Sequence, residues 1–124
     1  MSVIEVTGAS FDQLIESEQT LVLDFWASWC GPCQAFAPVF EAAAEQHPDV
    51  VFGKIDVDAN QDLAGNFSIR SVPTLMVLRE KVMLFSQPGA LTAGQLEQLL
   101  TEVKALDMAQ VHRDIAEKEA TEEE

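Results

Sequence analysis

The sequence predicts an α/β sandwich, in which helices cover both faces of a mixed central sheet in the order βαβαβαββα. Strand-like and helix-like segments alternate along the first half of the chain. The near-continuous apolar run Leu21–Ala27 is typical of a buried central strand. Two further apolar runs, Thr74–Leu78 and Val82–Ser86, lie only three residues apart and favour an antiparallel hairpin. Right-handed crossovers make the earlier strands parallel.

The first two elements are a short strand and a helix. Val3–Val6 alternates apolar and polar residues, as expected of an edge strand. Ser10 precedes Gln13 by three positions, which predicts a capping box at the start of a helix. Residues 11, 14 and 15 then give that helix one apolar face.

The middle of the chain contains two helices and a strand. Apolar residues recur at helical spacing from Gly31 to Gln46, with Pro38 expected to kink the helix and Pro48 to follow its end. Val50–Val57 has a strand pattern, and Asn60–Asn66 fits a short helix.

Two helix starts mark the end of the chain. Thr92 and Gln95 form a capping box, followed by a stripe of apolar residues at positions 96, 99, 100, 103 and 106. Asp107 and Gln110 repeat the signal, which predicts a second helix of about ten residues fraying into "EKEATEEE". We therefore expect one domain over residues 1–106, with residues 107–124 as an extension and not a separate domain.

The composition excludes several classes of protein. The formal net charge is −14, and such a surface repels phosphates, so no nucleic-acid partner is expected. The acidity fits a solvated surface, with electrostatic choice of a basic partner as the alternative. No apolar run is long enough to span a membrane, and the first ten residues do not resemble a signal peptide. The expected location is the cytoplasm and the expected state a monomer.

The stretch Phe25–Cys33, "FWASWCGPC", contains both cysteines and both tryptophans of the chain. Cys30 follows the predicted central strand and stands at the start of the next helix. Free N–H groups and the helix dipole favour a thiolate there. Cys33 lies one turn further on, where it can reach Cys30 and is expected to be less exposed, and Pro32 suits the first helical turn. Cys-x-x-Cys in a chain of this kind indicates redox or metal chemistry.

Three other interpretations of the cysteines are weaker. A zinc site needs about four ligands, and His47 and His112 lie at a helix end and in the tail. A structural disulfide that closes so short a loop would stabilise little. Chance pairing of core cysteines leaves Gly31 and Pro32 between them unexplained.

Three segments together resemble the thioredoxin family over about residues 3–106. They are "LVLDFWASWCGPC", "KIDVD" and "IRSVPTL", in this order. The resemblance implies the thioredoxin fold, no bound cofactor or metal, and a redox-active disulfide that reduces protein disulfides. A thioredoxin reductase would restore the dithiol, with NADPH used indirectly.

The resemblance also implies roles for single residues of the active site. Cys30 would be the attacking thiolate and Cys33 the resolving thiol. Asp24 matches the family's buried acid, which exchanges the proton of Cys33, and Lys54 matches the lysine beside that acid. An Asp inside an apolar strand should itself have a raised pKa, which suits this role. The alternative for Asp24 is a charge that reaches solvent at a strand end.

Further matches lie around the expected groove for the substrate. Trp29 matches the exposed ring beside the nucleophile, and Trp26 a ring packed beneath the loop, although core packing would otherwise be the simpler interpretation of both. The resemblance makes the loop at Val72, Pro73 and Thr74 a cis-proline loop that offers backbone groups to an extended substrate. Gly89 matches the glycine of the facing loop.

The chain also departs from the family pattern. Gln34 stands where bacterial forms often have lysine, which removes one cation near the thiolate. Ser71 and Pro88 alter the rim of the groove, and Glu80–Lys81 replaces an Asn-Gly type of hairpin turn. Two rival functions remain open: an interaction module that uses the groove or the tail, and a thiol oxidant or isomerase.

Overall fold

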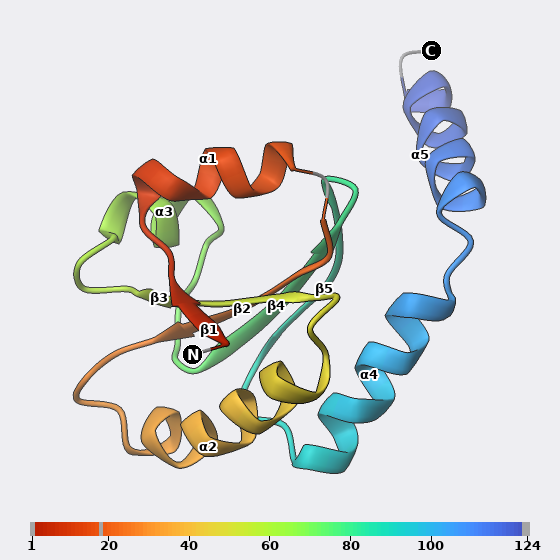
Figure 1. Cartoon of the computed structure of the whole chain (residues 1–124). Helices are drawn as coiled ribbons and strands as arrows, with labels where there is room; N and C mark the ends of the chain where they lie inside the picture. The colour runs from red at the N-terminus through yellow and green to blue at the C-terminus, as the bar shows by residue number, and fades with distance from the viewer. Residues whose placement is uncertain (1, 18, 123–124) are drawn as a thin grey trace.

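The structure is a computed structural model that describes residues 2–17 and 19–122. Its strands form one sheet in the order β1-β3-β2-β4-β5 (Figure 1). The elements in chain order are β1 (Val3–Glu5), α1 (Gly8–Glu16), β2 (Leu21–Trp26), α2 (Gly31–Gln46), β3 (Val51–Asp56), α3 (Gln61–Asn66), β4 (Thr74–Arg79), β5 (Val82–Pro88), α4 (Ala93–Ala105) and α5 (Met108–Glu122).

The topology is mixed, as the sequence predicts. Strands β1 and β2 both pair with β3 in parallel, whereas β4 pairs with β2 and β5 in antiparallel orientation. Strand β1 is at one edge, and β2 is at the centre of the sheet. The predicted edge strand, central strand and hairpin are therefore confirmed.

Helices cover both faces of the sheet: α1 and α3 lie on one side, and α2 and α4 on the other (Figure 1). Two core clusters agree with this arrangement. Phe36 and Phe40 of α2 pack with Leu96 of α4 in one cluster, and Phe11 of α1 packs with Leu63 of α3 in the other. Because side chains alternate along a strand, the inner strands β2, β3 and β4 contribute to both clusters.

Helix α1 begins earlier than predicted. Its N-cap is Thr7, whose hydroxyl accepts the N–H of Ser10 at 3.2 Å, while the Ser10 hydroxyl accepts the N–H of Thr7 at 2.9 Å. The predicted capping box of Ser10 with Gln13 is therefore wrong. Ser10 is the third helical residue of a box that starts at Thr7, because a serine can fill either place. The capping box of Thr92 with Gln95 is confirmed.

The hairpin turn between β4 and β5 adopts a conformation that is unusual for its residues. Glu80 and Lys81 both have positive φ, at 52° and 68°. Type I′ turns require this backbone, which Asn and Gly adopt more readily than Glu and Lys. The two strands also change register between Val77 and Leu78.

Helix α5 extends from Met108 to Glu122 and is longer than the ten residues predicted. Asp107 accepts the N–H of Gln110 at its start, and Gln110 donates to Asp114. These bonds support a helix that is otherwise mostly exposed. In Figure 1 the helix stands away from the sheet. Met108 is buried and His112 bonds Glu80 at 3.0 Å, so the helix is anchored at its first turns.

Candidate active site

The two cysteines form a disulfide at the junction of β2 and α2. Their Cα atoms lie 5.3 Å apart, and Cys30 is the N-cap of α2. The backbone N–H of Cys33 points at the Cys30 sulfur, with 3.1 Å between nitrogen and Sγ. Pro32 lies in the first turn of the helix, where its missing N–H leaves no bond unmade. The start of α2 thus supplies the donor that stabilises negative charge on Cys30 Sγ.

The sequence predicts that Cys33 is less exposed than Cys30, but in the structure the two side chains are almost equally buried. Cys30 is 4% and Cys33 3% exposed, and both pack in a small cluster with Ala27. Trp26 and Val72 are half-buried against the same cluster. In the disulfide form both cysteine side chains are therefore almost completely covered by their surroundings.

Trp29 is the exposed aromatic ring of the site, as the resemblance implies. The ring is 70% exposed, and its indole N–H donates to an Asp58 carboxylate oxygen at 2.9 Å. This bond fixes the orientation of a ring that has few packing contacts. Sequence reasoning missed Asp58, whose only signal is its place two residues after β3, the strand paired with β2.

The loop opposite the cysteines contains the Val72–Pro73 peptide bond, which is cis. The carbonyl oxygen of Val72 lies 3.6 Å from Cys30 Sγ. The carbonyl of Pro73 accepts the N–H of Gly89 at 2.8 Å, which joins the two predicted groove loops. Gly89 has φ of +100°, a backbone conformation that strongly favours glycine.

Thr74 is the first residue of β4 and borders a hollow together with Ser71 and Pro88. Its side chain is buried, and its hydroxyl donates to the Ser71 carbonyl at 2.7 Å. A small hollow of about 120 Å³ lies beside Trp29 and is bordered by Ile69, Arg70 and Val72. The sequence-predicted residues Trp29 and Val72 therefore share one apolar recess next to the disulfide.

Asp24 is buried in β2 and lies on the same side of the sheet as Trp26. Only 4% of its surface is exposed, and its Oδ1 atom has no hydrogen-bond partner among the described residues. Burial raises the pKa of Asp24 from 3.8 to about 7, and the positive charge of Lys54 lowers it in part. A carboxyl group with this pKa can both take and give a proton near neutral pH.

Lys54 pairs with Asp24 in the register of β2 and β3. Its ammonium nitrogen lies 4.9 Å from the centroid of the Trp26 ring, a cation–π distance. The structure therefore pairs Lys54 with Asp24, as the resemblance implies, and also places its ammonium over the ring of Trp26.

Gln34 follows Cys33 in α2 and is a neutral residue. Its side-chain amide donates to the Ser28 carbonyl at 3.0 Å, so it braces the loop before Cys30. A neutral amide contributes no charge to the thiolate, which leaves the backbone N–H groups of α2 as its main electrostatic support.

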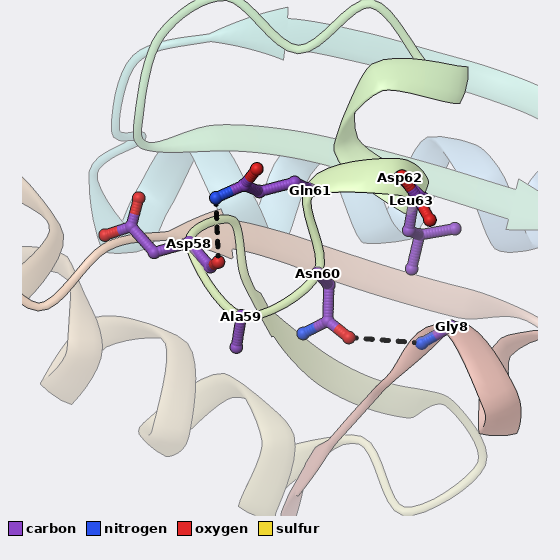
Figure 2. Close-up of a pocket in the computed structure, with 7 residues that line it drawn as sticks. All are labelled: Gly8, Asp58, Ala59, Asn60, Gln61, Asp62 and Leu63. Carbon is purple, nitrogen blue, oxygen red and sulfur yellow. Dashed lines mark hydrogen bonds between the residues drawn. The ribbon is translucent and has the colours of Figure 1, made fainter.

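A second, polar hollow lies beyond Asp58 (Figure 2). Its residues come from the start of α1, from the loop between β3 and α3, and from the start of α3: Gly8, Asp58, Ala59, Asn60, Gln61, Asp62 and Leu63. Asn60 accepts the N–H of Gly8 at 3.2 Å, and Gln61 donates to the Asp58 carbonyl at 3.3 Å. The first bond ties the loop that contains Asp58 to the start of α1, and the second is internal to the segment that follows β3.

Metal and membrane features were searched over residues 2–17 and 19–122. Within these residues, no cluster of three or more His, Cys, Asp and Glu side chains could hold a metal ion. Over the same part of the chain, no helix combines the length and apolar character that a membrane span requires.

Comparison with known proteins gives one consistent family. The family model described as thioredoxin matches residues 2–122. A protein of Streptomyces coelicolor with the provisional name thioredoxin 2 is 47% identical over 119 residues, covering 96% of this chain and 89% of its own. A thioredoxin of Porphyra purpurea is 39% identical over 104 residues, which are 82% of this chain and 97% of its own.

Solved structures give the same result. A mutant thioredoxin from Halobacterium salinarum superposes with a TM-score of 0.79 at 35% identity, covering 85% of this chain and 93% of that one. A chloroplastic thioredoxin z superposes with a TM-score of 0.78 at 32% identity, covering 86% and 97%.

Proposed function

This chain belongs to the thioredoxin family and is a dithiol–disulfide oxidoreductase, and we propose that Cys30 attacks the substrate disulfide and Cys33 resolves the product. The single observation that carries the assignment is the placement of Cys30 as the N-cap of α2, with the Cys33 N–H directed at its sulfur. Such a position lowers the pKa of a thiol and favours the nucleophilic thiolate.

The first step is an exchange of disulfides. The Cys30 thiolate attacks one sulfur of the substrate, the substrate S–S bond breaks, and the other substrate sulfur leaves as a thiolate. The product is a mixed disulfide between Cys30 and the substrate. The backbone carbonyl of Val72 lies 3.6 Å from Cys30 Sγ, and we propose that the substrate runs along this loop as an extended segment.

The second step resolves the mixed disulfide. Asp24 takes the proton of Cys33, and the Cys33 thiolate attacks Cys30 Sγ, which releases the second substrate sulfur as a thiolate. Two electrons pass to the substrate and the Cys30–Cys33 disulfide remains. The pKa of about 7 for Asp24 supports this role, because a carboxyl with an ordinary pKa would be a much weaker base.

The remaining groups position the reacting atoms. We propose that Lys54 tunes the basicity of Asp24, that Trp29 and Gly89 border the substrate, and that Gly31 and Pro32 set the geometry of the Cys-Gly-Pro-Cys turn. Protein disulfides and a reductase are the partners that the family suggests. We assign the reductase to the thioredoxin reductase class, drawing on NADPH, in the cytoplasm, where thiols are kept reduced.

The test is reductase-coupled reduction of insulin by the wild-type chain and by two variants. Cys30→Ser should lower the rate by about a hundredfold or more, because the remaining thiol, Cys33, is buried and does not occupy the N-cap of α2. Cys33→Ser should still attack, and should accumulate mixed disulfides that are visible by mass spectrometry. Full activity of Cys30→Ser would refute the assignment of roles.

Measuring the midpoint potential separates a reductant from an oxidant. A value near the roughly −270 mV known for thioredoxins supports the reducing function. A value closer to roughly −120 mV, as for a strong oxidant, would favour the rival thiol oxidase.

A further inference from the structure

Lys54 lies in a row of charged residues that crosses three strands of the sheet. It pairs with Asp24 of β2 on one side and with Glu5 of β1 on the other. Registered residues on neighbouring strands point to the same face, so all three side chains lie on the face that α2 covers. The row runs from the exposed Glu5, through the half-buried Lys54, to the buried Asp24.

A hollow of about 400 Å³ lies above the outer half of this row. It is lined by Ser2 and Val3, by Glu5 and Lys54 from the sheet, and by Glu41 and Glu45 from α2. Glu41 and Glu45 are four residues apart and therefore lie on one side of the helix. Lys54 thus faces three exposed carboxylates on its outer side and one buried carboxyl on its inner side.

No strong contact holds the ammonium group of Lys54 in one place. Among the described residues it makes no ion pair with a carboxylate, and its recorded partner is the ring of Trp26 at 4.9 Å. A lysine has four rotatable side-chain bonds, so neighbouring charges can shift the average position of its ammonium. Negative charges at the hollow attract a nearby ammonium by Coulomb's law, and their potential at Asp24 has the opposite sign to that of Lys54.

We propose that Glu5, Glu41 and Glu45 are positioning residues that draw Lys54 toward the hollow and so keep the buried Asp24 carboxyl basic enough to accept the Cys33 proton. This inference rests on the proposed role of Asp24 and adds the groups that control it. Opposing effects act on Asp24: burial favours its neutral form, and Lys54 favours its charged form. The glutamates weaken the second effect. Asp56, the next charged residue of β3 on this face, instead accepts the N–H groups of Asp58 and Ala59.

The test is a titration of Asp24 in the reduced chain by carboxyl-carbon NMR. This measures the protonation of the Asp24 carboxyl directly and does not depend on the rate of the reaction. The combined variant Glu5→Gln, Glu41→Gln and Glu45→Gln should lower the pKa of Asp24 by roughly half to one unit. The pH profile of insulin reduction should move in the same direction. Glu102→Gln is the matched control, since it removes an exposed carboxylate of α4 that does not line the hollow, and it should leave both readouts unchanged.

The same substitutions in a chain that lacks Lys54 show whether the glutamates act on Asp24 through Lys54 or directly. In a Lys54→Met chain the same three substitutions should move the Asp24 pKa by less than half as much, whereas Lys54→Arg should retain the shift. An unchanged Asp24 pKa in the folded triple variant would overturn the proposal, as would an equal shift in the Lys54→Met background. If Asp24→Asn leaves the rate of reduction unchanged, the proposed catalytic role of Asp24 is wrong. The effect of the three glutamates on the pKa of Asp24, measured by NMR, would remain valid in that case.

Discussion

The two faces of the sheet are built from alternate residues of the same strands but have different contents. In β2, Leu21, Leu23 and Phe25 pack against α1 and α3 in a cluster of apolar side chains. On the other face, the same strand presents Val22, Asp24 and Trp26. The first face can be packed for stability alone. The second must bury a carboxyl group beneath the disulfide, and this burial costs folding free energy.

Of the substitutions that test this difference between the faces, Asp24→Asn should change the free energy of unfolding the most. The folded pKa of Asp24 is about 7, against 3.8 for the ordinary group, so the native state binds more protons than the unfolded state between these values. Stability therefore falls as pH rises from about 4 to about 7 and is level above. Asparagine removes this loss, so the variant should be more stable at pH 8 by on the order of 4 kcal/mol.

Urea denaturation at pH 4 and pH 8 checks this prediction. The gain of Asp24→Asn over the wild type should be present at pH 8 and nearly absent at pH 4. Resolution of the mixed disulfide should be slower in the same variant. An equal gain at both pH values would mean that the side chain is destabilising for a steric and not an electrostatic reason.

Gly53→Ala tests the apolar face and should have an intermediate effect. A Cβ atom at this position in β3 would lie 2.6 Å from Cγ2 of Val6 and 3.3 Å from Cδ2 of Leu23. Both neighbours are fully buried and cannot move aside, so we expect a loss of about 1–3 kcal/mol in the free energy of unfolding. The Asp24 pKa should not change.

Gly94→Ala is the matched control, because a Cβ atom there meets nothing within 4 Å. It should be neutral or stabilising by up to about 1 kcal/mol. Chemical denaturation measures both variants. If Gly53→Ala proved as stable as the wild type, the close approach of Val6 and Leu23 to Gly53 would not be a packing constraint.

Truncation after Leu106 should have the smallest effect, since α5 belongs to neither face. Its buried anchor is Met108, and the bond between Glu80 and His112 is exposed. We expect a loss of about 1–2 kcal/mol in stability and no change in insulin reduction. Met108→Ala in the full chain should account for most of that loss.

The truncation also tests whether residues 107–124 bind a partner. A lower rate with the reductase, at normal stability, would make α5 a surface for partner binding. The Streptomyces relative aligns over 96% of the chain, so its alignment includes most of residues 107–124, whereas the Porphyra one covers 82%. We propose that the extension is an added helix and not a second domain.

The order of strands and helices followed from patterns that are local in the sequence. The apolar run Leu21–Ala27 predicted the buried central strand, and the short gap before Val82 predicted the hairpin. The cysteine motif is also local in the sequence. The start of α1 was misplaced because Thr7 and Ser10 are both good N-cap residues, and in the structure Ser10 is the third helical residue that completes the capping box of Thr7.

Parts of the site depend on register and could not be predicted. The resemblance supplied Lys54 and Asp24 but not Glu5, because the pairing of β1 with β3 is set by three-dimensional packing and not by spacing. The bond from Trp29 to Asp58 joins residues 29 positions apart, and no pattern in the sequence marks it.

Cys30 Sγ is both the proposed nucleophile and the acceptor that caps a helix of sixteen residues. The same contact that stabilises the thiolate also helps to begin α2. A substitution that weakens this contact therefore changes redox poise and helix stability together. Selection on the two properties is coupled through one atom, which restricts the routes by which this chain can evolve into an oxidant while keeping its fold.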